Sequence, residues 1–175
     1  AMAAQREANK WAFTAEDRAS LAPHFPRYHF VVPDSKAGPF DPNGNLFWKG
    51  RHHVFYIFTV PDERFPKGTA APFGHASSTD LVRWTFHPWA LEPEPNSPDG
   101  GGRCWSGDGF VWDGKPAIAY WGDRGQTCLA TSDDDLLEHW TKHPANPVIP
   151  SQPVVGRPQG GDHAPFVWKE GDTWY

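Results

Sequence analysis

The sequence predicts an all-β protein built from repeated four-stranded antiparallel units. Aromatic residues make up 15% of the 175 residues, ten of them Trp, and they alternate with clusters rich in Gly, Pro, Asp and Asn. Strands favour aromatic and β-branched residues, whereas Gly and Pro interrupt them. Two motifs also recur along the chain. Repetition of a four-stranded unit indicates a β-propeller, in which each blade is one such unit.

The first recurring motif is a hairpin. It begins with a short apolar strand ending in Trp and a turn that contains Gly, at residues 46–50, 110–114 and 166–171. A second apolar strand follows each turn, at residues 54–58, 117–121 and 174–175. Two short strands joined by such a turn are typical of a β-hairpin. Because Trp48, Trp112 and Trp168 hold equivalent positions in the three copies, we expect them to pack within the blades.

The second motif supplies the two outer strands of each unit. A strand ending in Ser, an Asp-rich turn and a strand opened by Trp occur at residues 76–84 and again at 130–140. Asp80 and residues 133–135 are expected to cap these turns. The whole unit repeats at roughly 55–65 residues, longer than the repeats of about 20–47 residues found in solenoids. The chain therefore holds two complete blades and the first hairpin of a third.

The part before the repeats is predicted to be a short lead-in. Residues 14–21 resemble a helix with Thr14 as its cap. We expect residues 1–26 to be this lead-in and residues 27–175 to be a partial propeller. Since propellers close with about four to eight blades, the chain is expected to be the N-terminal fragment of a longer protein.

Charge and composition exclude several classes of partner. A net charge of −5 gives no basic surface for nucleic acid. No apolar stretch approaches the ~20 residues that span a bilayer, so no membrane is expected as a partner. Cys104 and Cys128 are too few for a disulfide scaffold or a zinc site and are expected to be separate buried thiols. His52 and His53 must point to opposite faces of a strand, and no metal or other cofactor is expected.

One carboxylate stands out at residues 41–44, Asp-Pro-Asn-Gly. Pro42 fixes its own backbone and favours an extended conformation for Asp41, while Asn43 and Gly44 tolerate a positive φ. These residues predict a turn immediately before a strand. A carboxylate held in this way suits catalysis, although the same residues also form ordinary turns.

Several motifs in a fixed order give the chain a family resemblance. They are residues 27–30 (Arg-Tyr-His-Phe), 40–44 (Phe-Asp-Pro-Asn-Gly), 53–56 (His-Val-Phe-Tyr), 73–84 and 105–107 (Trp-Ser-Gly). Together they resemble glycoside hydrolase family 32, which contains the invertases, levanases and inulinases. The resemblance implies a five-bladed β-propeller and a retaining glycosidase that acts on fructose-containing or related furanosyl oligo- or polysaccharides. It also favours a secreted or periplasmic location, although residues 1–6 show no apolar signal core.

The resemblance also implies roles for individual residues. Asp41 matches the nucleophile. The motif of the transition-state stabiliser, Arg-Asp-Pro, falls near residues 160–165, where Asp162 is the nearest carboxylate, and the general acid is expected beyond Tyr175. Substrate contacts are implied for Asn43, His75, Trp105, Ser106, Asp108 and His163.

Some positions depart from the family pattern. Phe40, Ile57, Phe73 and Asp108 stand where the family usually has Asn, Gln, Trp and Ser, and Ala164 stands where the stabilising Asp is expected. Losing hydrogen-bonding groups at a site built for hydroxyls can change substrate discrimination by orders of magnitude. Two readings therefore stay open: a hydrolase, including variants that act on other furanosyl sugars, and a carbohydrate-binding propeller that has lost its catalytic set. We expect the fragment alone to be inactive.

Overall fold

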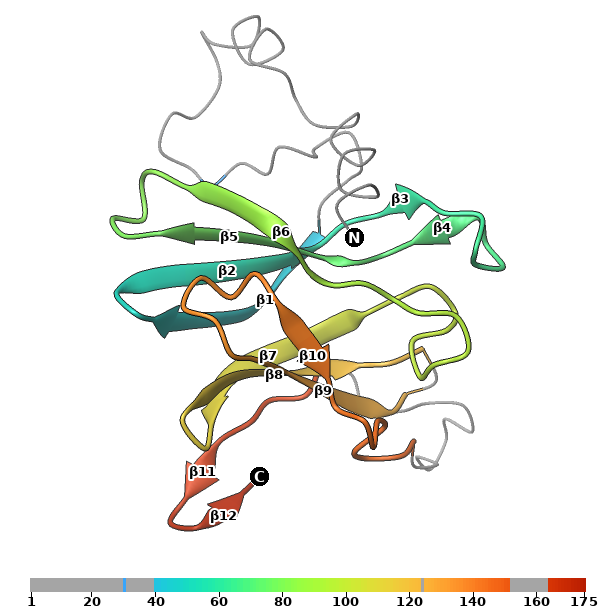
Figure 1. The fold of residues 1–175 in the computed structure, drawn as a ribbon. Coiled ribbons are helices and arrows are strands. Elements are labelled where there is room, and N and C mark those ends of the chain that lie inside the picture. Colours follow the sequence, from blue (N-terminus) through green and yellow to red (C-terminus); the bar gives the residue numbers. More distant parts are fainter. Residues whose placement is uncertain (1–29, 31–39, 124, 152–163) are drawn as a thin grey trace, which may run out of the picture.

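The computed structural model describes Phe30 and residues 40–123, 125–151 and 164–175. The strands in these residues form two four-stranded antiparallel sheets, which lie side by side in Figure 1. The first sheet has the order β1-β2-β5-β6, with bounds Phe40–Trp48, Arg51–Ile57, Phe73–Ser78 and Thr85–Leu91. The second has the order β10-β9-β8-β7, with bounds Trp140–Lys142, Thr127–Ser132, Lys115–Trp121 and Trp105–Trp112.

Two small ribbons accompany the sheets. Strands β3 (Val60–Pro61) and β4 (Thr69–Ala70) lie between β2 and β5 in the sequence and pair with each other. The sequence did not predict this ribbon. Strands β11 (Lys169–Glu170) and β12 (Thr173–Trp174) form the hairpin of the third repeat. The described residues contain no helix, and so none that could cross a membrane. The helix expected at residues 14–21 lies outside the described part of the chain.

The hairpin turns confirm the first recurring motif. Lys49 and Gly50 join β1 to β2 with φ values of 47° and 78°, and Asp113 and Gly114 join β7 to β8 with φ values of 48° and 80°. Two successive residues with positive φ are the mark of a type I′ turn, whose twist matches that of the strands on either side. The repeated Gly in the sequence is thus required by the backbone of each turn.

The Asp-rich turns confirm the second motif. One Asp80 carboxylate oxygen accepts hydrogen bonds from the backbone N–H groups of Val82 and Arg83. Asp134 accepts three such bonds in the second blade, from residues 136, 138 and 139. These carboxylates act as turn caps, because they satisfy backbone donors that no strand partner reaches. Asp133 and Asp135, which were also expected to cap this turn, form exposed ion pairs with Lys115 and Lys49 instead.

The main core lies between the two sheets. Along β8, alternate side chains point into this core and away from it. Ile118 and Tyr120 are buried in the cluster shared with the first sheet. Ala117 and Ala119 point the other way and pack with Val167, just before the third hairpin. Successive side chains of a strand point to opposite faces. Each face of the second sheet therefore meets a different neighbouring blade.

Strands β1 and β7 are the innermost strands of their blades and run in the same direction. Contacts between them advance along both strands, from Asn43 and Gly107 to Gly44 and Gly109. A Cβ atom on Gly109 would lie 2.1 Å from the carbonyl oxygen of Gly44. Only glycine permits this approach, which brings the first residues of both strands together at one end of the blades.

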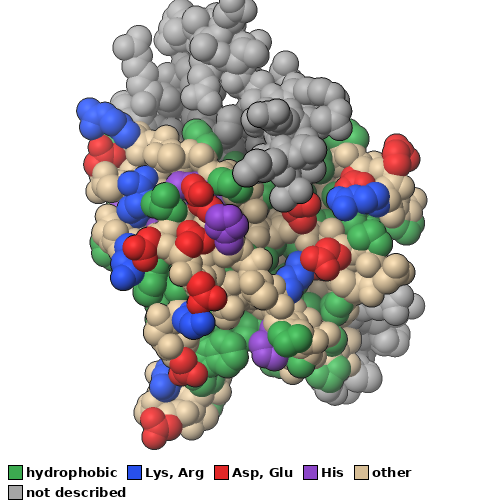
Figure 2. Space-filling view, viewed as in Figure 1, with side chains coloured by type: hydrophobic (Ala, Val, Ile, Leu, Met, Phe, Trp, Pro, Cys, Tyr) green, Lys and Arg blue, Asp and Glu red, His purple; other side chains and the backbone are tan. Residues whose placement is uncertain are grey.

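Charged side chains of both signs are mixed on the face shown in Figure 2. Exposed ion pairs among the described residues include Lys115 with Asp133 and Lys49 with Asp135. Pairs of this kind contribute about 0–1 kcal/mol each to stability. The stability of the blades therefore depends on the buried aromatic clusters.

Candidate active site

Asp41 lies in a β-bulge of β1. Phe40 pairs with Ile57 and Pro42 pairs with Tyr56, so Asp41 is an extra residue without a partner on β2. Its φ is 40°, a left-handed conformation. The expectation of an extended Asp41 in a turn before the strand is therefore wrong, because the segment is already part of β1. In a regular strand, side chains point alternately to the two faces of the sheet, and a bulge turns one side chain out of this pattern. In β1 the side chain that is turned in this way is the exposed carboxylate of Asp41.

Ser106 lies in a corresponding bulge of β7. Trp105 pairs with Trp121 and Gly107 pairs with Tyr120, which leaves Ser106 as the extra residue. The Ser106 hydroxyl donates a hydrogen bond of 2.8 Å to Oδ2 of Asp41. The other carboxylate oxygen of Asp41 has no hydrogen-bond partner among the described residues. Asp41 is thus oriented through one oxygen and open to a ligand through the other.

The Asn43 side chain holds the bulge at Asp41 in place through two hydrogen bonds. Its side-chain amide donates to the backbone carbonyl of Asp41 at 2.7 Å, and its Oδ1 accepts from the backbone N–H of Gly107 at 3.2 Å. Asn43 is only 6% exposed. It therefore connects the two bulged strands and holds the Asp41 backbone, and its side chain is already occupied by these two bonds.

Asp108 and Trp105 are also on β7. Asp108 Oδ2 accepts a hydrogen bond of 2.9 Å from the backbone N–H of Val167 and so ties the second blade to the third. Trp105 is half-buried, with the Arg103 guanidinium 5.1 Å from its ring centroid and the Trp121 ring 5.9 Å away. The structure brings Asp41, Asn43, Ser106 and these two residues together on two adjacent strands.

His75 lies elsewhere. Its side chain is fully buried, and its Nε2 is 2.9 Å from Nδ1 of His53. Its ring stacks on Phe55 and His87, with centroid distances of 4.5 and 4.4 Å. Burial lowers the pKa of His75 well below its usual value. His75 therefore packs as a neutral core residue in the described structure, which leaves its expected substrate contact without structural support.

The pairing of the strands explains this placement. Asn43 pairs with Phe55 and Phe55 pairs with His75, and residues opposite one another share a face of the sheet. The next residue in this row is His87, whose Nδ1 is 2.8 Å from a carboxylate oxygen of Glu138 in the second blade. The row therefore lies on the face that packs between the blades.

Asp162 and His163, the other two expected site residues, lie outside the described residues. Cys104 and Cys128 are free and buried, as predicted. Burial raises the pKa of both thiols, that of Cys128 to about 12. In the described ranges no group of three or more potential ligands could hold a metal ion.

Comparison with known proteins identifies the family. The sequence profile of the glycosyl hydrolases family 32 N-terminal domain matches residues 37–175. The chain belongs to glycoside hydrolase family 32. It is 34% identical over 75% of its length to a β-fructofuranosidase of Arabidopsis thaliana, insoluble isoenzyme CWINV5, and 34% identical over 75% to a fructan 6-exohydrolase of Beta vulgaris. It covers 24% and 22% of those proteins, so the chain spans about a quarter of the length of these curated relatives.

Solved structures of this family have the same fold. The family 32 β-fructofuranosidase of Bombyx mori matches with a TM-score of 0.69 and 29% identity, over 99% of this chain and 36% of that one. Fructan 1-exohydrolase IIa from Cichorium intybus matches with a TM-score of 0.60 and 32% identity, over 75% of this chain and 25% of that one. The fold is a five-bladed β-propeller, of which about two and a half blades are present.

Proposed function

We propose that the whole protein containing this chain is a retaining glycoside hydrolase for fructose-containing or related furanosyl saccharides, with Asp41 as nucleophile. The observation that supports this most is the placement of Asp41, an exposed carboxylate in a left-handed bulge, oriented by Ser106. Non-glycine residues rarely adopt a positive φ outside functional or tightly constrained positions. The names of the relatives, β-fructofuranosidase and fructan 6-exohydrolase, agree with the substrate class.

The proposed reaction has two steps. The free oxygen of Asp41 attacks the anomeric carbon while a carboxylic acid protonates the departing oxygen, which gives a covalent glycosyl-enzyme. Water then hydrolyses this ester with the same acid acting as base. Retaining enzymes place the two carboxyl groups about 5–5.5 Å apart. We assign the acid to a residue outside the described ranges, and Asp162 to stabilisation of the positive charge on the sugar. Residues 27–175 are proposed to belong to the propeller.

Among the described residues, Ser106 and Trp105 remain candidates for substrate contact. The Ser106 hydroxyl already donates to Asp41 but can still accept a hydrogen bond from a sugar hydroxyl. Trp105 offers a half-buried aromatic face beside it. Asp108 is less free, because one of its oxygens already accepts a hydrogen bond from the backbone N–H of Val167.

A trapping experiment tests the proposal. The whole protein is mixed with sucrose or a fructan oligosaccharide, quenched within milliseconds in acid, and digested. Peptide mass spectrometry should find a fructosyl ester on the peptide that contains Asp41, and NMR should show that the first product keeps the anomeric configuration of the substrate. An inverted product, or an ester on another residue, contradicts the assignment.

The second candidate is a carbohydrate-binding propeller without catalysis. Two observations favour it: Asp108 replaces a Ser of the family motif and bonds to the backbone of the next blade, and Ala164 stands where the stabilising Asp is expected. Saccharide binding in calorimetry without any product or trapped ester would support this candidate.

A further inference from the structure

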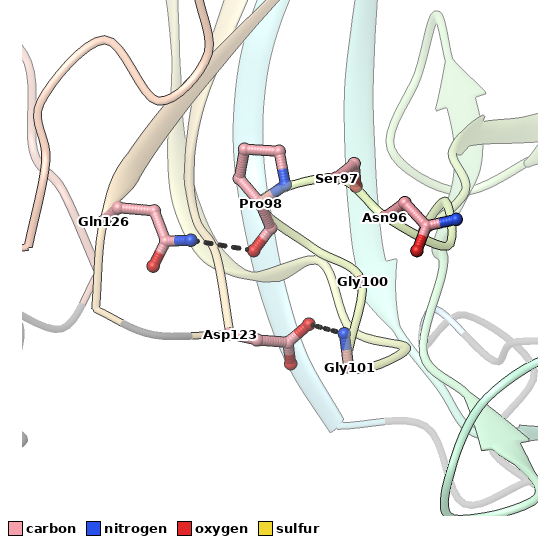
Figure 3. A pocket seen from close by; sticks show the side chains of 7 residues that line it. All are labelled: Asn96, Ser97, Pro98, Gly100, Gly101, Asp123 and Gln126. Carbon is pink, nitrogen blue, oxygen red and sulfur yellow. Dashed lines mark hydrogen bonds between the residues drawn. The ribbon is translucent and has the colours of Figure 1, made fainter.

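A cavity opens between the β6–β7 loop and the β8–β9 loop. It has a volume of about 490 Å³, within the range of roughly 300–1,000 Å³ usual for ligand sites. Figure 3 shows its two walls, the β6–β7 loop and the β8–β9 loop. The lining residues are Asn96, Ser97, Pro98, Gly100, Gly101, Asp123 and Gln126.

Hydrogen bonds hold the two walls in place. Asp123 Oδ2 accepts from the backbone N–H of Gly101 at 2.6 Å, and the Gln126 side-chain amide donates to the Pro98 carbonyl at 2.9 Å. A Cβ atom on Gly101 would lie 2.8 Å from the Asp123 carboxyl carbon, so a larger residue here would displace the Asp123 carboxylate. Beneath the loop, the buried Asp99 carboxylate pairs with Lys142 at 2.7 Å. The cavity is therefore formed before any ligand arrives.

The lining predicts the chemistry of the ligand. Asp123 offers a carboxylate whose pKa is raised by burial. Asn96 offers a side-chain amide that has no hydrogen-bond partner among the described residues. Among the described lining residues there is no Lys, Arg or His, and Pro98 is the main apolar side chain. A carboxylate and amides around a small polar space match a neutral ligand with several hydroxyl groups, because each can donate or accept with these partners.

The position of the cavity relates it to Asp41. Trp121, the last residue of β8, pairs with Trp105, which directly precedes Ser106. The wall residues Asp123 and Gln126 lie between the end of β8 and the start of β9, and therefore at the same end of the blade as Asp41. Since neighbouring strands are about 4.8 Å apart, this wall is one to two strand spacings, roughly 5–10 Å, outside β7.

We propose that this cavity binds a sugar unit of an oligo- or polysaccharide whose reacting end lies at Asp41. The position of the reacting end at Asp41 rests on the proposed function, because a saccharide has a reacting end only if the protein hydrolyses it. The cavity lies outside β7, so a saccharide must extend beyond the sugar unit held at Asp41 to reach it. A polysaccharide offers more such units than sucrose does, and the cavity therefore acts more strongly on longer saccharides than on sucrose.

Two variants of the whole protein test this site. Asn96→Gly removes the free amide and keeps the backbone relaxed, because Asn96 has a φ of 64°. Asp123→Asn keeps the shape and removes the charge. The matched control is Asp113→Gly, which also replaces a residue of positive φ, in the exposed β7–β8 turn at the opposite end of the blade. The loss of one hydrogen bond, about 0.5–1.5 kcal/mol, corresponds to a change of about 2- to 12-fold.

We expect both variants to lower kcat/KM for inulin and levan by this factor, to lower kcat/KM for sucrose by less, and to leave the melting temperature unchanged, as in the control. Equal losses on sucrose and on the polymers, or no loss on either, overturn the proposal. If the protein cleaves no saccharide, the proposed function fails, and calorimetric titration with inulin-type oligosaccharides still decides the binding site. Weaker binding by Asn96→Gly than by wild type then supports the cavity, and equal or absent binding overturns it.

Discussion

Asp41 and Ser106 are each the second residue of the innermost strand of a blade, each is the extra residue of a β-bulge, and the Ser106 hydroxyl donates to the Asp41 carboxylate at 2.8 Å. The two blades thus use the same local distortion at the same place, one to present a carboxylate and the other to present its donor. Bulges are frequent near functional sites because they redirect side chains without breaking the sheet.

Replacement of Asp41 by Asn is expected to abolish hydrolysis without unfolding the protein. An amide cannot form the glycosyl ester, and loss of a nucleophile lowers kcat by on the order of 10⁴-fold or more. Asn tolerates the positive φ of this position. Initial rates on sucrose, inulin and levan measure the effect, with circular dichroism as the fold control. Asp113→Asn, another Asp of positive φ, should keep full activity; a folded Asp41→Asn protein that does the same contradicts the assignment.

Replacement of Ser106 by Ala should reduce kcat while leaving the fold unchanged. The variant removes the only described donor to the Asp41 carboxylate, and a hydrogen bond to a charged group is worth about 1.5–3 kcal/mol, or roughly 10- to 160-fold. Ser106→Thr, which retains a hydroxyl, should recover part of the rate. A purely structural role for Ser106 predicts instead a lower melting temperature and no difference between the two variants.

Asn43→Ala is expected to destabilise the protein. Asn43 is buried, and its loss leaves the Gly107 N–H and the Asp41 carbonyl without their partner. Both bonds are partly buried, and each contributes about 0.5–1.5 kcal/mol to stability. Urea denaturation measures the change in unfolding free energy. The neighbouring Asn45→Ala is the matched control, since Asn45 is exposed, and a similar loss in both would show that Asn43 has no special role.

Stability is expected to fall as the pH drops from about 6.5 to about 4. Burial lowers the pKa of His53 to about 4, and burial also lowers that of His75. Since the unfolded chain binds protons to these rings near pH 6.5 and the folded chain does not, acid favours unfolding in this range. Urea denaturation at pH 7.5, 6, 5 and 4 measures the slope. A His53→Leu/His75→Phe double variant should flatten it, and an unchanged slope would assign the effect to other groups.

Lys142→Met is expected to cost about 3–5 kcal/mol of stability, because it leaves the buried Asp99 carboxylate without its cation. Lys115→Met removes a cation from the exposed pair with Asp133 and should cost at most about 1 kcal/mol. Chemical denaturation of both variants compares the two environments. Equal costs would mean that the Asp99 carboxylate is stabilised by its other donors alone.

The sequence was sufficient for the blades because their signals are local. The turns at Lys49–Gly50 and Asp113–Gly114 need positive φ values, and the Asp80 side chain caps the chain immediately after it. Such features depend on neighbours within a few residues, so the hairpins and outer strands could be predicted together with their repeat.

The site was harder to predict because its geometry depends on pairing between strands. The residue before a proline is usually extended, yet Asp41 has a φ of 40° because β2 pairs around it. Asp108 was expected to face a sugar, but one of its oxygens accepts from Val167, which is 59 residues away. No local signal reports a partner that far along the chain.

The close approach of Gly44 and Gly109 makes the space between the two sheets a wedge. The inner edge is as narrow as backbone contact allows, whereas bulky rings such as Phe55, Tyr120 and Trp140 hold the sheets apart farther out. The angle of this wedge sets how far each blade rotates from the one before it, and therefore how many blades complete the circle. A larger side chain at residue 109 would open the inner edge, reduce the angle, and widen the opening at the centre of the ring.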